Sequence, residues 1–334
     1  MDYRGVMRRH SSPASGIGES LLRDAPSAAI ATVKINARFA RCRSTSFPPV
    51  GLLIAQAAAI QIRQIEKLSS LADVELRVLS QNGEDGIIEW LIHRLRIEPP
   101  SFVEIGAEIN EANTRFLLDN RGWKGLYIDG NPSINELRDS FLWRQDISAV
   151  HSFVNAENVN SLIGSAGFKG QIGLLSLDID GNDYWVWRAI EVVNPAIVIC
   201  EYNAVLGDLL PLVIPYDPLF RRTRAHPSNI YWGASIAALV QLASEKGYRL
   251  AGTNSHGLNA FFVRNDYAPR LDGRIADTSP RMSRYRTAAS GFRSGLNRFE
   301  MIADQVVIDL RDGAQRRLRD LQPVYSEAWI REQT

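Results

Sequence analysis

Residues 101–106 read SFVEIG and residues 125–129 read GLYID, and these two stretches decide the fold. Both are short runs with β-branched or aromatic side chains, and both end in a glycine or an acid. Runs of this length and composition are typical of strands buried in a parallel sheet. The residues between them suffice for one helix, so the pair predicts a strand–helix–strand unit.

The same pattern recurs along the middle of the chain. Each run is short, is bounded by Gly, Asn or Asp, and is followed by a sequence with helical periodicity. Alternation of strands and helices at this spacing predicts a doubly wound α/β sheet. The predicted parallel strands are residues 101–105, 125–128, 151–154, 174–177 and 196–200.

Two later runs break this alternation. Residues 248–252 and 258–263 are separated only by the turn-rich sequence TNSHG, which leaves no room for a helix. They predict an antiparallel hairpin. Parallel strands closed by a hairpin form the α/β, Rossmann-like sheet of class I methyltransferases. A dinucleotide dehydrogenase would instead continue with another strand–helix unit.

Composition divides the 334 residues into three zones. Residues 1–74 are rich in Ser, Ala, Pro and Arg and contain one helical stretch, near 52–70, so they predict a partly disordered extension. Residues 75–265 carry the strand pattern and predict the methyltransferase-like domain. Residues 266–334 mix arginines with aspartates and predict a helical C-terminal extension.

Bulk properties argue against several classes of protein. The formal net charge of +1 gives no reason to expect nucleic acid as a partner. No long run is continuously apolar, so the sequence predicts no membrane span. Cys42 and Cys200 are too few and too far apart for a disulfide framework, which favours a reducing, cytoplasmic location.

Polar residues cluster after the predicted strands, where doubly wound sheets bind their ligands. Gly106 follows the first strand and, lacking a Cβ, lets the backbone approach a ligand. Asp129 ends the second strand, where a carboxylate accepts hydrogen bonds from ribose hydroxyls. No G-x-G-x-x-G loop for a pyrophosphate follows the first strand, which disfavours NAD. S-adenosylmethionine, whose tail is an amino acid, needs no such loop.

The fourth strand is followed by the acidic sequence DIDGND at 178–183. Its carboxylates suit a divalent cation such as Mg²⁺, with ligands from the next strand end. The alternative is a general base, Asp178 or Asp180, while the other acids shape the loop, where Asp183 also fits a helix cap. His256 in the hairpin turn is a candidate second base. The candidate metal ligands are Asp178, Asp180, Asp183, Glu201 and Asn203.

Two neighbouring segments have competing interpretations. Tyr184, Trp185 and Trp187 follow the acidic sequence at helical spacing, which favours core packing over stacking on a substrate. The proline-rich segment, Pro211–Trp232, contains too many prolines for a helix and is either a solvated loop or a lid over the site. Its arginines, which would suit an anionic acceptor, are Arg221, Arg222 and Arg224.

Taken together, these motifs resemble the FkbM-like branch of class I S-adenosylmethionine-dependent methyltransferases. The resemblance begins at LSQNGEDG (79–86) and continues through the first two strand ends. It includes LDIDGNDYW (177–185) and EYN (201–203) and ends near NAFFVR (259–264), over a little more than half of the chain. The chain departs from the family at 108–110, where EIN replaces the usual acidic-glycine entry to the first helix.

Carried over by position, the resemblance implies a set of cofactor-binding residues. Glu104 and Gly106 would lie near the methionine and ribose of S-adenosylmethionine, and Asp129 would bind the ribose. Asn155 or Glu157 would lie near the adenine. In similar enzymes the segment before the first strand closes over the cofactor, although an acid there also fits the start of a helix. In this chain that segment contributes Ser80, Gln81 and Glu84.

These features predict an S-adenosylmethionine-dependent methyltransferase that acts on a hydroxyl of a sugar or small metabolite. Two other classes stay open: a methyltransferase-like domain that has lost its chemistry and serves as a binding module, and a nucleotide-sugar or NAD enzyme. The expected partner is a small-molecule or glycan acceptor, with neither nucleic acid nor a membrane. The sequence leaves open which acceptor is used and whether the chain forms a homo-oligomer.

Overall fold

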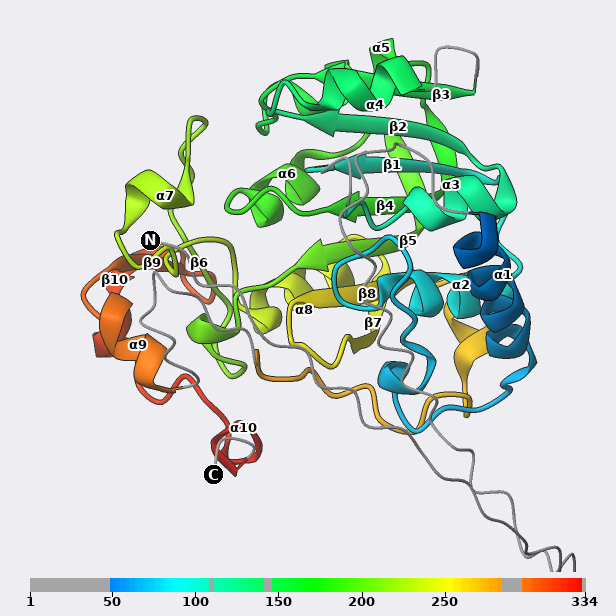
Figure 1. The fold of residues 1–334 in the computed structure, drawn as a ribbon. Coiled ribbons are helices and arrows are strands. Elements are labelled where there is room, and N and C mark those ends of the chain that lie inside the picture. Colours follow the sequence, from blue (N-terminus) through cyan, green and yellow to red (C-terminus); the bar gives the residue numbers. More distant parts are fainter. Residues whose placement is uncertain (1–48, 108–110, 141–145, 284–295, 332–334) are drawn as a thin grey trace, which may run out of the picture. The chain divides into compact units, whose positions relative to one another are not determined.

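A seven-stranded sheet forms the centre of the computed structural model, which describes residues 49–107, 111–140, 146–283 and 296–331 (Figure 1). The strand order is β3-β2-β1-β4-β5-β8-β7. Strands β1 to β5 run parallel, and β8 lies antiparallel between β5 and β7. This order is that of class I methyltransferase sheets, so the predicted fold class is confirmed. The strands are β1 Ser101–Ile105, β2 Lys124–Asp129, β3 Ile147–His151, β4 Gly170–Leu177, β5 Val193–Glu201, β7 Tyr248–Thr253 and β8 Asn259–Arg264.

One predicted strand is misplaced. The third strand spans Ile147–His151 and not residues 151–154. It lies at the edge of the sheet, where its side chains are only half-buried and give a weak apolar signal. Phe153 and Val154, whose apolar character suggested the strand, follow it and line a cleft instead. The other parallel strands and the hairpin are confirmed.

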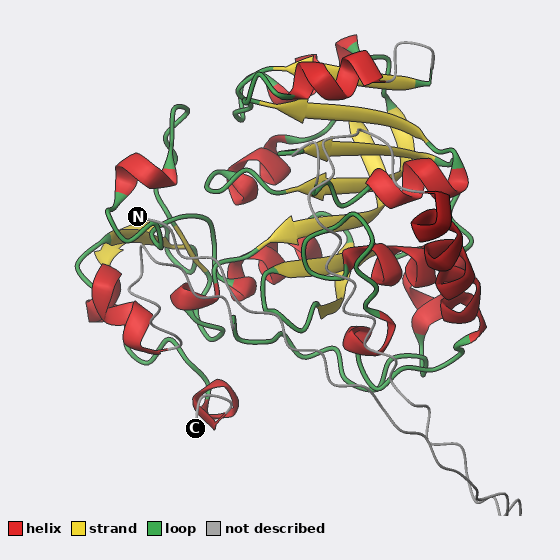
Figure 2. Ribbon diagram, viewed as in Figure 1, coloured by secondary structure: helices red, strands yellow, loops and turns green. Residues whose placement is uncertain are grey.

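Helices cover both faces of the sheet (Figure 2). Because side chains alternate along a strand, Val103 and Ile105 enter one core while Phe102 enters the other. Helices α5, α6 and α8 pack in the first core, and α1 to α4 contribute to the second. No helix among the described residues combines the length and apolar character needed to cross a bilayer. These helices are α1 Pro49–Gln64, α2 Glu84–Leu95, α3 Arg115–Arg121, α4 Ile134–Ser140, α5 Val159–Ser165, α6 Asp183–Ala189 and α8 Ile236–Glu245.

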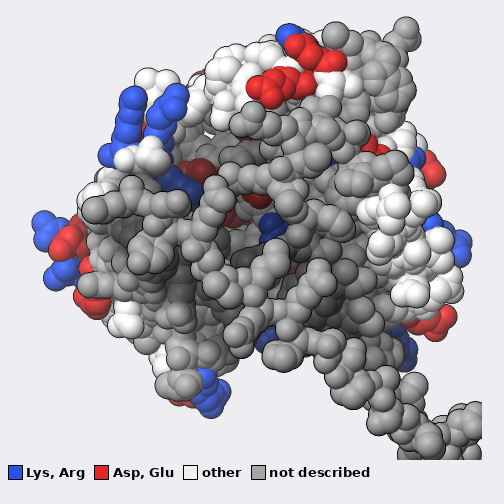
Figure 3. Space-filling view, viewed as in Figure 1, with Lys and Arg blue, Asp and Glu red and all other residues white. Residues whose placement is uncertain are grey.

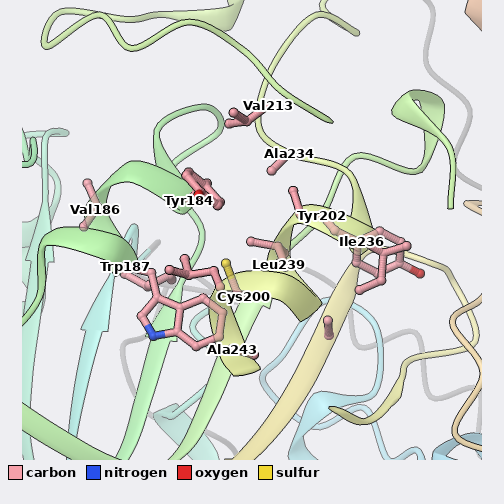
Figure 4. Close-up of a cluster of buried hydrophobic side chains, with 14 of the residues drawn as sticks. Tyr184, Val186, Trp187, Cys200, Tyr202, Val213, Ala234, Ile236, Leu239 and Ala243 are labelled. Carbon is pink, nitrogen blue, oxygen red and sulfur yellow. The ribbon is translucent and has the colours of Figure 1, made fainter. Parts of the chain in front are cut away.

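The first core confirms the packing interpretation of the aromatic residues on α6. Trp187 is almost fully buried, and its ring packs against Phe262, with centroids 5.0 Å apart. Figure 4 shows Trp187 and Tyr184 among aliphatic side chains near Cys200, which is a buried free thiol. Trp185 is partly buried and donates its indole N–H to the Ile214 carbonyl at 3.0 Å. None of the three aromatic residues lines the cleft.

The described part of the N-terminal extension packs on the sheet domain. Helix α1 confirms the predicted helical stretch, and its Arg63 pairs with the buried Glu89 of α2 at 2.5 Å. Glu89 also pairs with Arg121 of α3 at 2.7 Å, so one buried carboxylate joins three helices. All described residues belong to one compact unit, Ala37–Thr334. Cys42 and the Arg-rich start of the chain lie outside the described residues.

The C-terminal extension is only partly helical, contrary to the prediction. Besides two short α-helices, its described residues contain the hairpin β9–β10, which forms a second sheet with β6 in the order β10-β9-β6. An Asp-Gly turn signal at 312–313 was the missed indication of this hairpin, and Gly313 has a positive φ of 75°. The remaining elements are β6 Leu212–Val213, α7 Arg222–Ala225, α9 Leu296–Ile302, β9 Val306–Asp309, β10 Ala314–Arg317 and α10 Glu327–Arg331, with 3₁₀ turns η1 Leu71–Val74, η2 Ala204–Leu206, η3 Ala268–Leu271 and η4 Leu318–Leu321.

Candidate functional site

A cleft of about 760 Å³ opens over the carboxyl ends of β1, β2, β4 and β5. Ligands of doubly wound sheets bind at this edge, because the chain crosses to the other side of the sheet between β1 and β4. Acidic surface is visible within the hollow of the face drawn in Figure 3. The lining includes Gln81, Glu104, Gly106, Asp129, Phe153, Asp178, Asp180, Asn182, Glu201, Asn203, Phe220, Arg222, Trp232 and Arg298.

Gly106 lies where the ends of β1 and β4 come closest together. It has a φ of 88°, and a Cβ built on it would lie 1.6 Å from the Asp178 carbonyl oxygen. Its N–H donates to the Ile128 carbonyl at 2.9 Å. Only glycine fits this position, so Gly106 is required both by the fold and by the open backbone on the cleft.

Asp129 ends β2 and lines the cleft, as its predicted role requires. Its Oδ1 accepts a hydrogen bond from the Asn131 N–H at 2.5 Å, while Oδ2 has no protein donor among the described residues. Burial raises the pKa of Asp129, and the Asn131 N–H and His151 oppose this increase. Asp129 therefore keeps one oxygen available for the hydroxyl groups of a ligand.

Glu104 is buried at the end of β1, with both carboxylate oxygens in use. One oxygen accepts the Asn113 N–H at 2.7 Å, and the other accepts the N–H and hydroxyl of Thr114 at 3.0 and 2.5 Å. Burial raises the pKa of Glu104 to about 7 despite these donors. Glu104 therefore holds the loop that follows β1. The neighbouring segment 108–110 lies outside the described residues.

Three acids form a cluster at the ends of β4 and β5. One oxygen from each of Asp178, Asp180 and Glu201 lies within 4.8 Å of the others. Glu201 is 7% exposed, and its Oε2 is buried without a hydrogen-bond partner in the described structure. Burial raises the pKa of Asp178 and Glu201 well above their usual ranges, and the neighbouring carboxylates raise them further. The acid cluster therefore favours protonation or a neighbouring cation.

The proline-rich segment supplies a cation to the acid cluster. An Nη atom of Arg222 lies 2.5 Å from the Asp180 carboxylate, and the Arg222 charge lowers the pKa of all three acids. Arg221 instead lies over the Phe153 ring, 5.2 Å from its centroid, and Arg224 is exposed. Arg222 therefore forms an ion pair within the protein, whereas the sequence suggested that it would bind an anionic acceptor.

Two of the five predicted metal ligands use their side chains in hydrogen bonds that hold neighbouring loops. The carboxylate of Asp183 accepts the N–H groups of Ile179 and Gly181 at 2.9 and 3.0 Å, which fixes the acidic loop before α6. The Asn203 amide donates to the Ile230 and Trp232 carbonyls at 2.7 and 2.8 Å. Asp183 contributes no oxygen to the acid cluster, and Asn203 Oδ1 accepts the Val205 N–H at 3.0 Å.

The segment before β1 brings one of its three predicted residues to the cleft. Gln81 lines the cleft and donates to Glu111 at 2.6 Å. Ser80 is buried against Asp85, with its hydroxyl 3.0 Å from the carboxylate. Glu84 is buried and accepts the amides of Asn254 and Asn259 at 2.8 and 2.9 Å. Ser80 and Glu84 therefore fasten this segment to α2 and to the β7–β8 hairpin.

Three other predicted residues lie outside the cleft lining. Asn155 exchanges hydrogen bonds with Asn158, and Glu157 accepts the Tyr216 hydroxyl. The early end of β3 explains this result, because Phe153 and Val154 occupy the position expected for the residues that follow the strand. His256 is exposed in the turn between β7 and β8.

The structure adds two cleft residues that the sequence did not indicate as functional. Asn182 is a buried residue of the cleft lining, and its Nδ2 donates to the Asp217 carbonyl at 2.7 Å. Arg298, on α9, is 7% exposed and also lines the cleft. Asn182 belongs to the acidic sequence and could have been noticed. Arg298 is remote in sequence from the other cleft residues, so only tertiary packing reveals it.

Comparisons with known proteins give similarities of fold alone. No protein-family model matches this chain, and no curated protein matches it in sequence. A solved structure of the pyocyanin biosynthetic protein PhzM aligns at 14% identity and a TM-score of 0.31, covering 53% of this chain and 56% of that one. This chain thus aligns with just over half of PhzM. A chain from the complex of the Haloferax volcanii Trm112 methyltransferase activator and the putative methyltransferase aligns at 14% identity and a TM-score of 0.28, covering 62% and 78%. Similarity this low carries no information about substrate.

Proposed function

We propose that this chain is an S-adenosylmethionine-dependent methyltransferase of the FkbM-like type, acting on a hydroxyl of a sugar or another small metabolite. The position of the cleft carries the proposal. It lies over the carboxyl ends of β1, β2, β4 and β5 in a sheet with class I strand order. Gly106, Asp129 and the acid cluster all line it.

The cleft residues suit the cofactor. A bound S-adenosylmethionine would supply a methyl group on a sulfonium, which needs little activation beyond alignment with its acceptor. Asp129 Oδ2, which has no donor among the described residues, suits the ribose hydroxyls, and Gly106 leaves the backbone open beside it. The acids of the cleft favour a ligand that carries a positive sulfonium. The cleft volume lies within the range of small-molecule sites.

The acid cluster is the group best placed to act on the acceptor. Asp178 would take up the proton of the acceptor hydroxyl, while a bound S-adenosylmethionine would supply the methyl group to the acceptor oxygen and leave as S-adenosylhomocysteine. Glu201 lies beside Asp178, and the two can share one proton, since burial disfavours two charges at this distance. The proline-rich segment lies at the cleft and contributes Phe220 and Trp232 to its wall.

Calorimetric titration with S-adenosylmethionine and S-adenosylhomocysteine tests the proposal. We expect binding by the full chain and a loss of about tenfold or more in Asp129→Ala, because hydrogen bonds to a charged group contribute about 1.5–3 kcal/mol. Asp139→Ala is the matched control, since Asp139 is an exposed acid on α4 that pairs with Arg138. It should bind as the parent does.

The competing classes give different results in the same titration. Folded protein that binds neither compound would overturn the proposal and favour the binding module. Binding of NAD or a nucleotide sugar in their place would favour the nucleotide enzyme. For a chain that binds the cofactor, screening of sugar and small-metabolite hydroxyls with Mg²⁺ or with a chelator identifies the acceptor class.

A further inference from the structure

We propose that Asp178, Asp180 and Glu201 bind a divalent cation through their oxygens, and that Arg222 occupies the Asp180 side of this site when no cation is bound. The role of this cation rests on the proposed function, in which it would lie beside the acceptor hydroxyl. Its binding can nevertheless be measured without cofactor or acceptor.

The spacing of the three oxygens suits a hard cation. They lie within 4.8 Å of one another and come from two adjacent strand ends. Opposite ligands lie about 4.2 Å apart around Mg²⁺ and about 4.8 Å apart around Ca²⁺, given metal–oxygen distances of about 2.1 and 2.4 Å. The 4.8 Å limit equals the span across one such cation, so rotation of the side chains would bring the three oxygens around it. Its ligands are all carboxylate oxygens, which favours Mg²⁺, Mn²⁺ or Ca²⁺ over softer metals.

Unpaired oxygens of two residues that line the cleft point independently to a positive ligand. Glu201 Oε2 and Asn182 Oδ1 are both buried without a hydrogen-bond partner in the described part of the chain. The orientation of the Asn182 amide is fixed, because its Nδ2 donates to the Asp217 carbonyl. Buried acceptors without donors are rare in folded proteins because they are costly. A cation bound at the acid cluster would satisfy Glu201 Oε2.

Arg222 already neutralises the exposed side of the cluster. Its guanidinium lies 2.5 Å from Asp180, whose side chain is 49% exposed, whereas Glu201 lies deeper. A divalent cation on the same carboxylate would repel this guanidinium. Arg222 belongs to the four-residue helix α7 of the proline-rich segment, which forms part of the cleft wall. A cation that displaces Arg222 from Asp180 would therefore also change the cleft wall.

Titration of Mn²⁺ into chelator-treated full chain, followed by electron paramagnetic resonance, tests the site directly. We expect one bound ion that Mg²⁺ displaces. Asp180→Asn should weaken binding about tenfold or more, because it removes one charged ligand. The half-exposed position of Asp180 lets this variant keep its fold, which its melting temperature checks. Asp139→Asn, an exposed acid away from the cluster, should bind Mn²⁺ as the parent does.

The competing arginine is tested by a pair of variants on one helix. Arg222→Ala should bind Mn²⁺ about tenfold more tightly, because a neighbouring positive charge is removed. Arg224→Ala, an exposed arginine two residues away, should leave the affinity unchanged. Equal affinities in the two variants would overturn the role of Arg222.

The outcomes separate this inference from the proposed function. A chain that binds S-adenosylmethionine but not Mn²⁺ would overturn the cation site. The cluster would then be a proton-sharing pair of acids neutralised by Arg222. A chain that binds Mn²⁺ at the three acids but no cofactor would keep the site and overturn the methyltransferase.

Discussion

The two sides of the cleft hold their carboxylates in opposite ways. At the end of β1, Glu104 is surrounded by donors from Asn113 and Thr114, and both of its oxygens are in use. At the ends of β4 and β5, Asp178 and Glu201 face each other and share one external cation, Arg222. Burial raises the pKa on both sides, yet only the first side compensates with hydrogen bonds from its own backbone.

This difference separates carboxylates that build the loops from carboxylates that are left for ligands. Asp183 behaves like Glu104, because each of its two carboxylate oxygens accepts a backbone N–H group. Glu201 keeps a buried oxygen without a donor in the described structure. A buried acid saturated by backbone donors is therefore read as structural, and one left unsaturated on a cleft as functional.

The largest expected effect is at Gly106, where the two sides meet. Gly106→Ala should destabilise the protein by about 3 kcal/mol or more, because the new Cβ meets the Asp178 carbonyl in a backbone region that disfavours side chains. Chemical denaturation measures the free energy of unfolding. Any folded fraction should lose binding of cofactor and cation together, since the β4 end must move.

Gly122→Ala is the matched control for this prediction. Gly122 also has a positive φ, 63°, but a Cβ there meets nothing within 4 Å. It should cost only about 1 kcal/mol, the strain of the backbone alone. Similar losses in the two variants would show that the close contact between β1 and β4 does not constrain the site.

The second-largest expected effect is a pH dependence of the free energy of unfolding, caused by Glu104. Its pKa is about 7 in the folded protein and 4.5 in the unfolded chain. The stability contributed by protonated Glu104 is therefore fully present below pH 4.5 and is lost as the pH rises through 7. The loss is on the order of 3 kcal/mol, because a pKa difference of one is worth about 1.4 kcal/mol.

Glu104→Gln isolates this contribution from other acids. Asp85, which faces Glu104, and Asp183 both have pKa values raised to about 6 by burial, and they remain in the variant. The free energy of unfolding should therefore fall less steeply between pH 5 and pH 8 in Glu104→Gln than in the parent. Parallel curves from denaturation at several pH values would contradict the role assigned to Glu104.

The fold could be predicted because buried parallel strands have a strong local signal. The runs at β1, β2, β4 and β5 are apolar on both faces, and the short turn between β7 and β8 permits only a hairpin. The same reasoning failed at β3, whose half-buried edge position weakens that signal. It also failed at β9–β10, where side chains alternate between buried and exposed and the strands are short.

The sequence predicted the cleft residues whose location depends on their position along a strand. It missed the roles that depend on hydrogen-bond or ion-pair partners. Gly106, Asp129 and Asp178 follow strands and reach the cleft as expected. The saturation of Asp183 by backbone N–H groups depends on the conformation of the loop, which residue type does not specify. The pairing of Arg222 with Asp180 joins segments that are remote in sequence, so composition suggested an anionic acceptor instead.

The smallest expected effect is the difference in stability between variants of two acids of one loop, Asp183 and Asp180. It tests most directly whether loop-building acids differ from ligand-facing acids. Asp183→Ala should cost about 2 kcal/mol, because two N–H groups lose their acceptor. Asp180→Ala should cost about 1 kcal/mol, since it removes a half-exposed ion pair and leaves alanine at a φ of 57°. Cation binding should show the opposite preference, because Asp180 supplies a ligand and Asp183 only holds the loop. Denaturation and Mn²⁺ titration of the two variants measure both quantities, and a larger stability loss in Asp180→Ala would contradict the division between loop-building and ligand-facing acids.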